Sequence, residues 1–212
     1  YKRQGAGGTL AFAENDGPKV IDAELTITDV DDSNIESATI TISSGFQSAE
    51  DVLAFTDTNE INGSWSASTG VLTLSGSATK ANYEAALESV TYNNTSENPN
   101  TSNRTISWQI NDGTANSSVV TSTISLTAVN DAPVLSGAGG TLAYTENDGA
   151  KVIDAELTIT DVDDTNISSA TVTISSGFQS AEDVLAFSNT SSIAGSWNAS
   201  TGVLTLLSLI HI

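Results

Sequence analysis

The chain contains 212 residues with 26 acidic and 6 basic side chains, which gives a formal net charge of −20 at pH 7. Such a charge excludes binding to nucleic-acid phosphates or anionic lipid head groups as the main function. The absence of cysteine excludes a disulfide framework. With 38% hydrophobic residues the composition favours packed domains over disorder, and the acidic, lysine-poor balance fits a protein in salt water or at a cell exterior.

Both ends of the chain differ from the rest. YKRQ at the start is what TAT-AAG-AGA-CAG encodes, and LSLIHI at the end is what CTG-TCT-CTT-ATA-CAC-ATC encodes. These codons resemble the two orientations of a transposase mosaic-end adaptor used in sequencing libraries. We therefore predict that residues 1–4 and 207–212 are adaptor-derived, that residues 5–206 are an internal fragment, and that His211 has no functional role. Without Lys2 and Arg3, 4 basic residues remain against 26 acidic ones, a formal charge of −22.

The natural part of the chain contains a long internal repeat. Residues 5–74 align with residues 137–206 without a gap, and 58 of the 70 positions are identical. The offset of 132 residues is too long for a solenoid unit and suits a whole domain. We predict one complete repeat at 5–133 and a second, incomplete repeat at 134–206.

Within a repeat, apolar and polar residues alternate with a period of two. The alternation marks residues 23–28, 38–42, 104–112 and 120–129, and short turn signals such as NDG, SSG and STG separate the apolar runs. This pattern is typical of half-buried strands in antiparallel sheets. We predict an all-β fold of tandem antiparallel Greek-key β-sandwiches, in which Trp108 alternates with isoleucines and points inward.

One segment departs from this period. Residues 78–90 place Tyr83, Ala86, Leu87 and Val90 at helical spacing, with Ser77 or Thr79 available as the N-cap. We predict one short helix per repeat, crossing an edge of the sandwich.

The sequence offers no catalytic constellation. Cysteine is absent, and the single histidine lies in the segment that we exclude. Two carboxylates can hydrolyse a glycoside only when a cleft holds them about 5 to 9 Å apart, and nothing in the sequence marks such a cleft. We predict that the chain is not an enzyme.

Acidic residues gather directly after one strand of each repeat. DVDD at 29–32 and again at 161–164 packs three carboxylates into four residues. Like charges at close range favour a bound cation, and a hard divalent ion prefers oxygen ligands. A solvated acidic turn explains the pattern equally well, because aspartate is a good turn former. An EF-hand is excluded, because Asn34 stands where glycine is needed and Ile40 where a bidentate glutamate is needed.

The acidic motifs occur in a recognisable order. DVDDSN followed by ATITI, the early ENDG, the strand-turn-strand WSASTGVLTL and the linker AVNDAPV together resemble the bacterial cadherin-like repeats of large surface or secreted adhesins of the RTX type. The resemblance implies bound Ca²⁺. Its ligands at the joint between the repeats would be Glu14, Asn130, Asp131, Asp161, Asp163 and Asn166; Asp29, Asp31, Asn34 and Asp112 would serve a preceding joint, and Glu146 is the counterpart of Glu14.

The chain also departs from the cadherin pattern. Ala128 replaces the first linker aspartate, the linker is one residue shorter between Asp131 and Pro133, and the LDRE motif is missing. Fewer ligands imply fewer ions and weaker binding, with a dissociation constant of about 0.1 to 1 mM.

These observations give two hypotheses of function. The first is a calcium-binding, calcium-stiffened extender and adhesion repeat of a bacterial cell-surface or secreted adhesin. Its partners would be neighbouring repeats of the same chain and a cell-surface protein or glycan, with no nucleic acid and no membrane insertion of this segment. The alternative is a carbohydrate-binding or accessory β-sandwich module of a surface polysaccharide-degrading enzyme, which would need exposed aromatic residues in a row.

Overall fold

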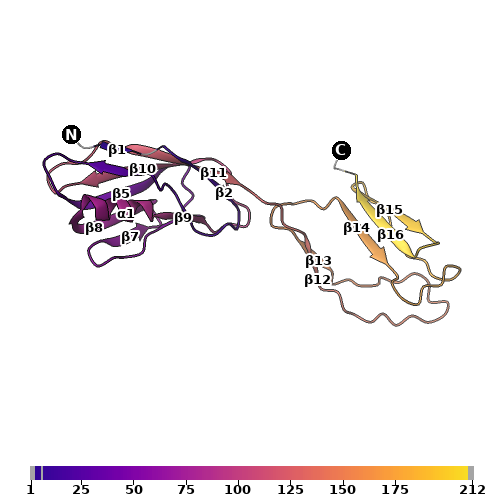
Figure 1. The fold of residues 1–212 in the computed structure, drawn as a ribbon. Coiled ribbons are helices and arrows are strands. Elements are labelled where there is room, and N and C mark those ends of the chain that lie inside the picture. Colours follow the sequence, from indigo (N-terminus) through magenta and orange to yellow (C-terminus); the bar gives the residue numbers. More distant parts are fainter. Residues whose placement is uncertain (1–2, 6, 210–212) are drawn as a thin grey trace. The chain divides into compact units, whose positions relative to one another are not determined.

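The computed structural model describes residues 3–5 and 7–209, so Tyr1, Lys2 and His211 lie outside the described residues. The chain divides into two compact units, unit 1 (residues 1–130) and unit 2 (residues 131–212). Both are built from strands (Figure 1), which confirms the predicted all-β class. No helix in the described part of the chain is long and apolar enough to cross a membrane.

Unit 1 is a β-sandwich. Its larger sheet has the order β2-β11-β10-β5-β8-β7, and its smaller sheet has the order β3-β9-β6, with a separate β1-β4 pair. All strand pairs are antiparallel except β2 with β11, which is parallel. The bounds are β1 Arg3–Gly5, β2 Thr9–Ala13, β3 Lys19–Val20, β4 Thr26–Thr28, β5 Asn34–Ser44, β6 Asp51–Ala54, β7 Asn62–Ser66, β8 Val71–Thr79, β9 Thr91–Asn94, β10 Arg104–Asn111 and β11 Val120–Thr127.

The core of unit 1 follows from the alternation of its strands. In β10 every second side chain is buried, and Trp108 is fully buried among the isoleucines, as predicted. The Trp108 indole N–H donates to Ser122 Oγ on β11 at 3.0 Å. The rings of Phe12 on β2 and Tyr92 on β9 meet edge to face with centroids 5.1 Å apart, so the two sheets share one core.

The one helix in the described part of the chain, α1, spans Lys80–Glu88. Thr79 is its N-cap, because the Thr79 hydroxyl accepts the backbone N–H of Asn82 at 3.2 Å. Tyr83, Ala86 and Leu87 are buried on its inner face, and Val90 is buried directly after it. The predicted helix, its N-cap and its apolar face are therefore confirmed in unit 1.

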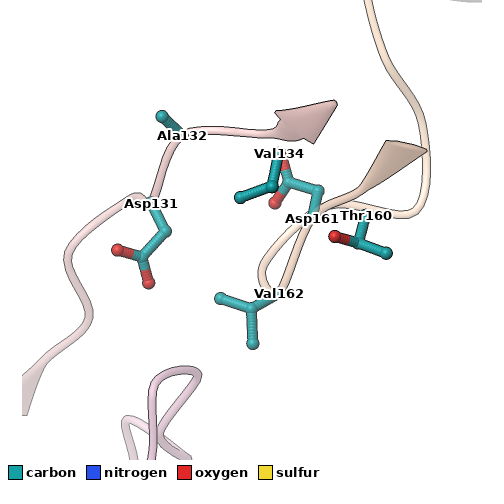
Figure 2. Close-up of a pocket in the computed structure, with 6 residues that line it drawn as sticks. All are labelled: Asp131, Ala132, Val134, Thr160, Asp161 and Val162. Atoms are coloured by element: carbon teal, nitrogen blue, oxygen red, sulfur yellow. The ribbon is translucent and has the colours of Figure 1, made fainter. Parts of the chain in front are cut away.

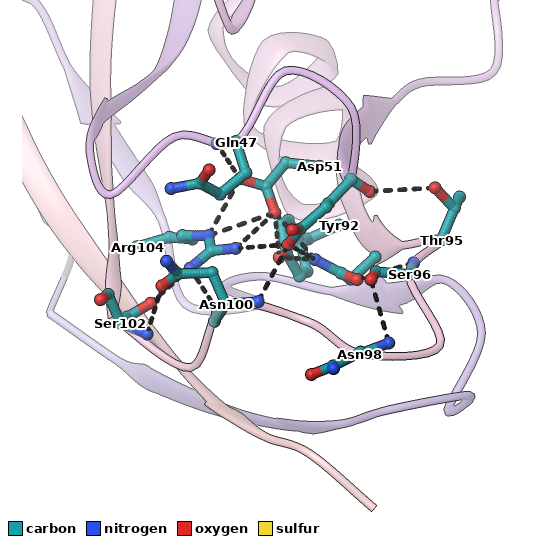
Figure 3. Close-up of polar contacts among 11 residues, drawn as sticks. Gln47, Asp51, Tyr92, Thr95, Ser96, Asn98, Asn100, Ser102 and Arg104 are labelled. Atoms are coloured by element: carbon teal, nitrogen blue, oxygen red, sulfur yellow. Dashed lines mark hydrogen bonds and ion pairs between the residues drawn. The ribbon is translucent and has the colours of Figure 1, made fainter. Parts of the chain in front are cut away.

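One charged residue of unit 1, Arg104, is fully buried. Its guanidinium forms a bidentate ion pair with Asp51, which is 2% exposed: Nε donates to Oδ2 at 2.9 Å and Nη2 donates to Oδ1 at 3.1 Å. Tyr92 Oη donates to the same Asp51 Oδ1 at 2.6 Å, and Arg104 Nη1 donates to the carbonyl oxygens of Asn100 and Ser102. This network (Figure 3) ties β6, β9 and β10 to the loop that precedes β10.

Unit 2 contains a smaller set of strands. β12 (Val134–Ser136) pairs with β13 (Thr158–Thr160), and β16 (Val203–Ser208) lies between β14 (Ser169–Thr173) and β15 (Ile193–Asn198). β14, β15 and β16 repeat the arrangement of β5, β7 and β8. The described residues of unit 2 contain no helix, because the match to unit 1 stops at Leu206, before the counterpart of α1.

Candidate functional site

Carboxylates gather at one end of unit 1, where the DVDD turn follows β4. Asp29 Oδ1 accepts the backbone N–H groups of Asp31 and Asp32 at 3.0 and 3.1 Å, which folds the turn back on itself. Lys80 Nζ donates to the carbonyl oxygens of Asp29 and Asp32 at 2.7 and 2.9 Å. The lysine thus braces the backbone of the turn and does not bind its carboxylates through these two contacts.

Asp112 meets this turn from the loop after β10. Its Oδ1 accepts the N–H groups of Thr114 and Ala115, both at 2.7 Å, so the side chain is held in a tight turn. Asp29, Asp32 and Asp112 each offer one carboxylate oxygen, and the three oxygens lie within 4.8 Å of one another. We call these three residues the acidic cluster. Asp31 lines the depression beside it.

Asn34 plays another part. It begins β5, and its side-chain amide donates to Ser77 Oγ at 3.3 Å. Among the predicted ligands of the preceding joint, the structure therefore brings Asp29 and Asp112 together, places Asp31 beside them, and engages the Asn34 amide with β8.

Glu14 occupies a different place in unit 1, in the turn after β2. It is 6% exposed, and its Oε2 accepts the Val129 N–H at 2.9 Å, which ties the carboxylate to the start of the linker. Its Oε1 is buried without a hydrogen-bond partner in the described part of the chain. A carboxylate oxygen of Glu97 lies within 4.8 Å of a Glu14 carboxylate oxygen. Asn15 Nδ2 donates a hydrogen bond to Glu97 Oε2 at 2.9 Å.

The turn that presents Glu14 is stabilised by its own polar contacts. Asp16 Oδ2 accepts the N–H of Ala13 at 2.6 Å and forms an ion pair with Lys19 at 2.5 Å. The hydrogen bond from Lys19 keeps the pKa of Asp16 below its usual value. Asn15 adopts a left-handed conformation with φ 63°, which asparagine tolerates.

In unit 2 the linker meets the second DVDD turn. The backbone N–H of Asp131 donates to Asp163 Oδ2 at 2.6 Å, and Asp161 Oδ1 accepts the N–H groups of Asp163 and Asp164 at 3.1 and 3.0 Å. Asp131 and Asp161 line one depression with Ala132 and Val162 among others (Figure 2). The structure therefore brings together three of the predicted ligands of this unit.

The other predicted ligands are placed differently. Asn166 in unit 2 is exposed, and Asn130 is the last residue of unit 1. Glu146 is also exposed, whereas its counterpart Glu14 is buried. In unit 1 the Val129 N–H and the Glu97 carboxylate lie beside Glu14, and the described residues of unit 2 contain no counterparts of these two residues.

Sequence reasoning missed three residues. Asp32 joins the acidic cluster in addition to Asp31, and its place in the same DVDD run was the available signal. Glu97 approaches Glu14 from a loop 83 positions away in the sequence, and Lys80 braces the turn from α1. Neither long-range contact leaves a local pattern in the sequence.

Comparison with known proteins gives one partial likeness. A stretch of 86 residues is 41% identical to Halomucin of Haloquadratum walsbyi (strain DSM 16790 / HBSQ001). The match covers 38% of this chain and 1% of Halomucin, so the chain spans only a very small part of the curated relative it matches. No family model matches the chain.

Proposed function

We propose that this chain is a non-enzymatic, calcium-binding β-sandwich repeat that extends a cell-surface or secreted adhesin. The observation that carries the proposal is Glu14, a carboxylate that is 6% exposed, has one oxygen without a hydrogen-bond partner among the described residues, and lies beside the Glu97 carboxylate. A buried carboxylate oxygen without a hydrogen-bond donor is unfavourable, and a second carboxylate nearby adds repulsion. A divalent cation removes both costs at once.

The acidic cluster supports the same chemistry at the other end of unit 1. Three carboxylate oxygens within 4.8 Å of one another suit a hard cation with oxygen ligands. Lys80 donates to carbonyl oxygens of the turn, so the backbone is braced while carboxylate oxygens stay close together. Calcium suits such a set better than magnesium, because calcium tolerates irregular geometry and more ligands.

Calcium would also limit motion of the linker. In unit 1 the linker begins at a hydrogen bond from Val129 to Glu14, and in unit 2 it continues with a hydrogen bond from Asp131 to Asp163. Both carboxylates, Glu14 and Asp163, are proposed calcium ligands. Calcium binding would therefore hold in place the side chains that accept the linker N–H groups of Val129 and Asp131. The partial likeness to Halomucin, of which the match is 1%, supports a place for this chain in a very long protein.

The carbohydrate-binding alternative lacks a supporting observation. Trp108 is fully buried and donates to Ser122, so it cannot stack on a sugar. Trp65 and Trp197 are partly buried and pack edge to face against Phe46 and Phe178. The described tryptophans therefore serve packing in both units.

Calcium titration by isothermal calorimetry, together with thermal melting, tests binding. We expect saturable binding with a dissociation constant of about 0.1 to 1 mM, a higher melting temperature in calcium than in chelator, and much weaker binding of magnesium. Glu14→Gln and Asp112→Asn should each weaken binding at least tenfold, by analogy with the loss of a charged ligand. Glu24→Gln, an exposed carboxylate outside both groups, is the matched control. Unchanged calorimetric titrations in both variants would refute the sites.

Small-angle X-ray scattering tests the mechanical part of the proposal separately. A calcium-stiffened chain should have a larger or more sharply defined maximum dimension with calcium than with chelator. An identical scattering profile in both conditions, combined with calorimetric binding, would leave calcium binding intact and overturn the stiffening.

A further inference from the structure

We propose that the buried ion pair of Arg104 and Asp51 positions Glu97 for the calcium site at Glu14. This role rests on the proposed function, because it concerns how unit 1 assembles that site. Glu14 is buried and has one carboxylate oxygen without a hydrogen-bond partner among the described residues. Glu97, in contrast, is exposed and belongs to the β9–β10 loop, residues 95–103. An exposed side chain on a loop remains beside a carboxylate that repels it only when the loop itself is held in place.

The beginning of the β9–β10 loop is tied to Asp51 through Asn94. The backbone N–H of Ser96 donates to Asn94 Oδ1 at 3.0 Å, and Asn94 Nδ2 donates to Asp51 Oδ1 at 3.1 Å. Asn94 and Asp51 are both buried, and a hydrogen bond between buried groups is electrostatically stronger than one in water. The residue directly before Glu97 is therefore anchored to the buried ion pair.

The end of the loop is tied to the same ion pair through Arg104. The Arg104 guanidinium donates from Nη1 to the carbonyl oxygens of Asn100 and Ser102 at 2.8 and 2.5 Å. Nε and Nη2 of this guanidinium bind Asp51 (Figure 3). A planar guanidinium holds its acceptors in fixed directions, so these contacts define the path of the backbone between Asn100 and β10. Both ends of the loop therefore converge on one buried ion pair.

Glu97 lies between these two anchors and meets Glu14. The Asn98 N–H donates to Ser96 Oγ at 3.1 Å, so a short hydrogen-bonded turn surrounds Glu97. Asn15 Nδ2, from the turn that presents Glu14, donates to Glu97 Oε2 at 2.9 Å. A carboxylate oxygen of Glu97 lies within 4.8 Å of one of Glu14. The loop thus brings a second carboxylate to a buried carboxylate that is distant in the sequence.

This arrangement orders the site before calcium binds. Two neighbouring carboxylates repel each other in the absence of a cation, and a mobile loop would carry Glu97 away from Glu14. The buried ion pair fixes the loop when the unit folds, so less conformational entropy is lost when calcium binds. Loosening the loop should therefore weaken calcium binding at Glu14 although both carboxylates remain. If the ion pair served stability alone, folded variants would keep the full affinity.

Calcium titration of the full chain labelled with ¹⁵N tests this role. The Asn15 amide, next to Glu14, reports binding at the Glu14 site, and the Gly113 amide, next to Asp112, reports binding at the acidic cluster. The two amides separate a local change at the Glu14 site from a general loss of stability, which would weaken binding at both. Dispersed amide resonances in each spectrum show that a variant is folded.

Two variants loosen the loop and leave both carboxylates in place. Arg104→Lys keeps the charge opposite Asp51 but lacks the planar fork that holds the loop carbonyls, so the dissociation constant at Asn15 should rise about tenfold. Ser96→Ala removes the acceptor of the Asn98 N–H and should raise the same constant about threefold. The matched control, Ser64→Ala, replaces an exposed serine on β7 and should leave the constant unchanged.

The ion pair acts through Glu97, so its effect should disappear when Glu97 is no longer a ligand. Glu97→Gln alone should raise the dissociation constant at Asn15 at least about tenfold. Adding Arg104→Lys to Glu97→Gln should change the constant by less than about twofold. An equal loss of affinity from Arg104→Lys in both backgrounds would contradict the positioning role.

The possible outcomes distinguish this role from the proposed function. Absence of a calcium-dependent shift at Asn15 in the unmodified chain would refute the Glu14 site itself, and the positioning role with it. A saturable shift at Asn15 with the same dissociation constant in Ser96→Ala, Arg104→Lys and the unmodified chain would leave the site intact and overturn the positioning role. Equal weakening at Asn15 and Gly113 in Arg104→Lys would also overturn it, because the ion pair would then act through stability alone.

Discussion

Replacing Arg104 by methionine removes the guanidinium that neutralises Asp51 inside unit 1. Both side chains of this ion pair have zero exposure, and Arg104 also donates to the carbonyl oxygens of Asn100 and Ser102. Removing one partner of a buried pair leaves an uncompensated charge and costs about 3 to 5 kcal/mol. Because Tyr92 still donates to Asp51, we expect the lower end of this range, about 3 kcal/mol.

Urea denaturation followed through the Trp108 indole resonance in NMR spectra measures this effect, because Trp108 belongs to unit 1, is fully buried and therefore reports the unfolding of that unit. Lys19→Met is the matched control: its ion pair with Asp16 is solvent-exposed and its loss should leave the midpoint unchanged. The double variant Asp51→Leu with Arg104→Met should be milder than Arg104→Met alone, because no charge remains buried. A loss below about 1 kcal/mol in Arg104→Met would refute the assignment of Arg104 as a buried, essential counter-ion.

Three further predictions concern the same unit. Burial raises the pKa of Tyr83 to about 12, so ionisation of Tyr83 leaves the free energy of unfolding unchanged below pH 10 and lowers it by up to about 3 kcal/mol as the pH rises from 10 to 12. The melting temperature should therefore fall less steeply with pH above 10 in Tyr83→Phe than in the unmodified chain, and an identical pH dependence would contradict this. Thr79→Ala removes the N-cap of α1 and should cost about 1 kcal/mol in urea denaturation, with Thr79→Ser neutral. Gly76 has φ 133° and a Cβ there would lie 1.9 Å from the Glu60 carbonyl oxygen, so Gly76→Ala should cost at least about 3 kcal/mol, while Gly17→Ala, which meets no atom within 4 Å, should cost about 1 kcal/mol; equal melting temperatures would contradict the steric argument.

Local patterns predicted the elements of unit 1 well. Strand alternation marked β5, β10 and β11, and helical spacing together with Thr79 marked α1, because these signals depend only on neighbouring residues. Arg104 shares the parity of Ile106 and Trp108 in β10, so its burial was readable from the sequence, although a charged residue at an inward position was not interpreted in that way.

Nonlocal features were less accessible. The parallel pairing of β2 with β11 joins residues more than a hundred positions apart, and alternation alone carries no information about a strand's partner. The same limit applies to the candidate site. DVDD identified the turn, but the approach of Asp112, Glu97 and Lys80 depends on how distant segments pack. Sequence patterns thus identified the carboxylates of the turn itself and missed most of the distant residues that pack around the candidate sites.

The two copies of the repeat separate local from long-range causes of burial. Leu72 and its counterpart Leu204 are 2% and 6% exposed, because each lies in a hairpin whose partner strand is nearby in the sequence. Leu25 and Leu157 have the same local sequence and are 1% and 48% exposed, because the core around Leu25 is completed by elements after residue 75. Alternation therefore shows which side chains can be buried, while the presence of a distant segment decides whether they are. In unit 1, residues 75–130 are therefore the segment whose packing completes the core.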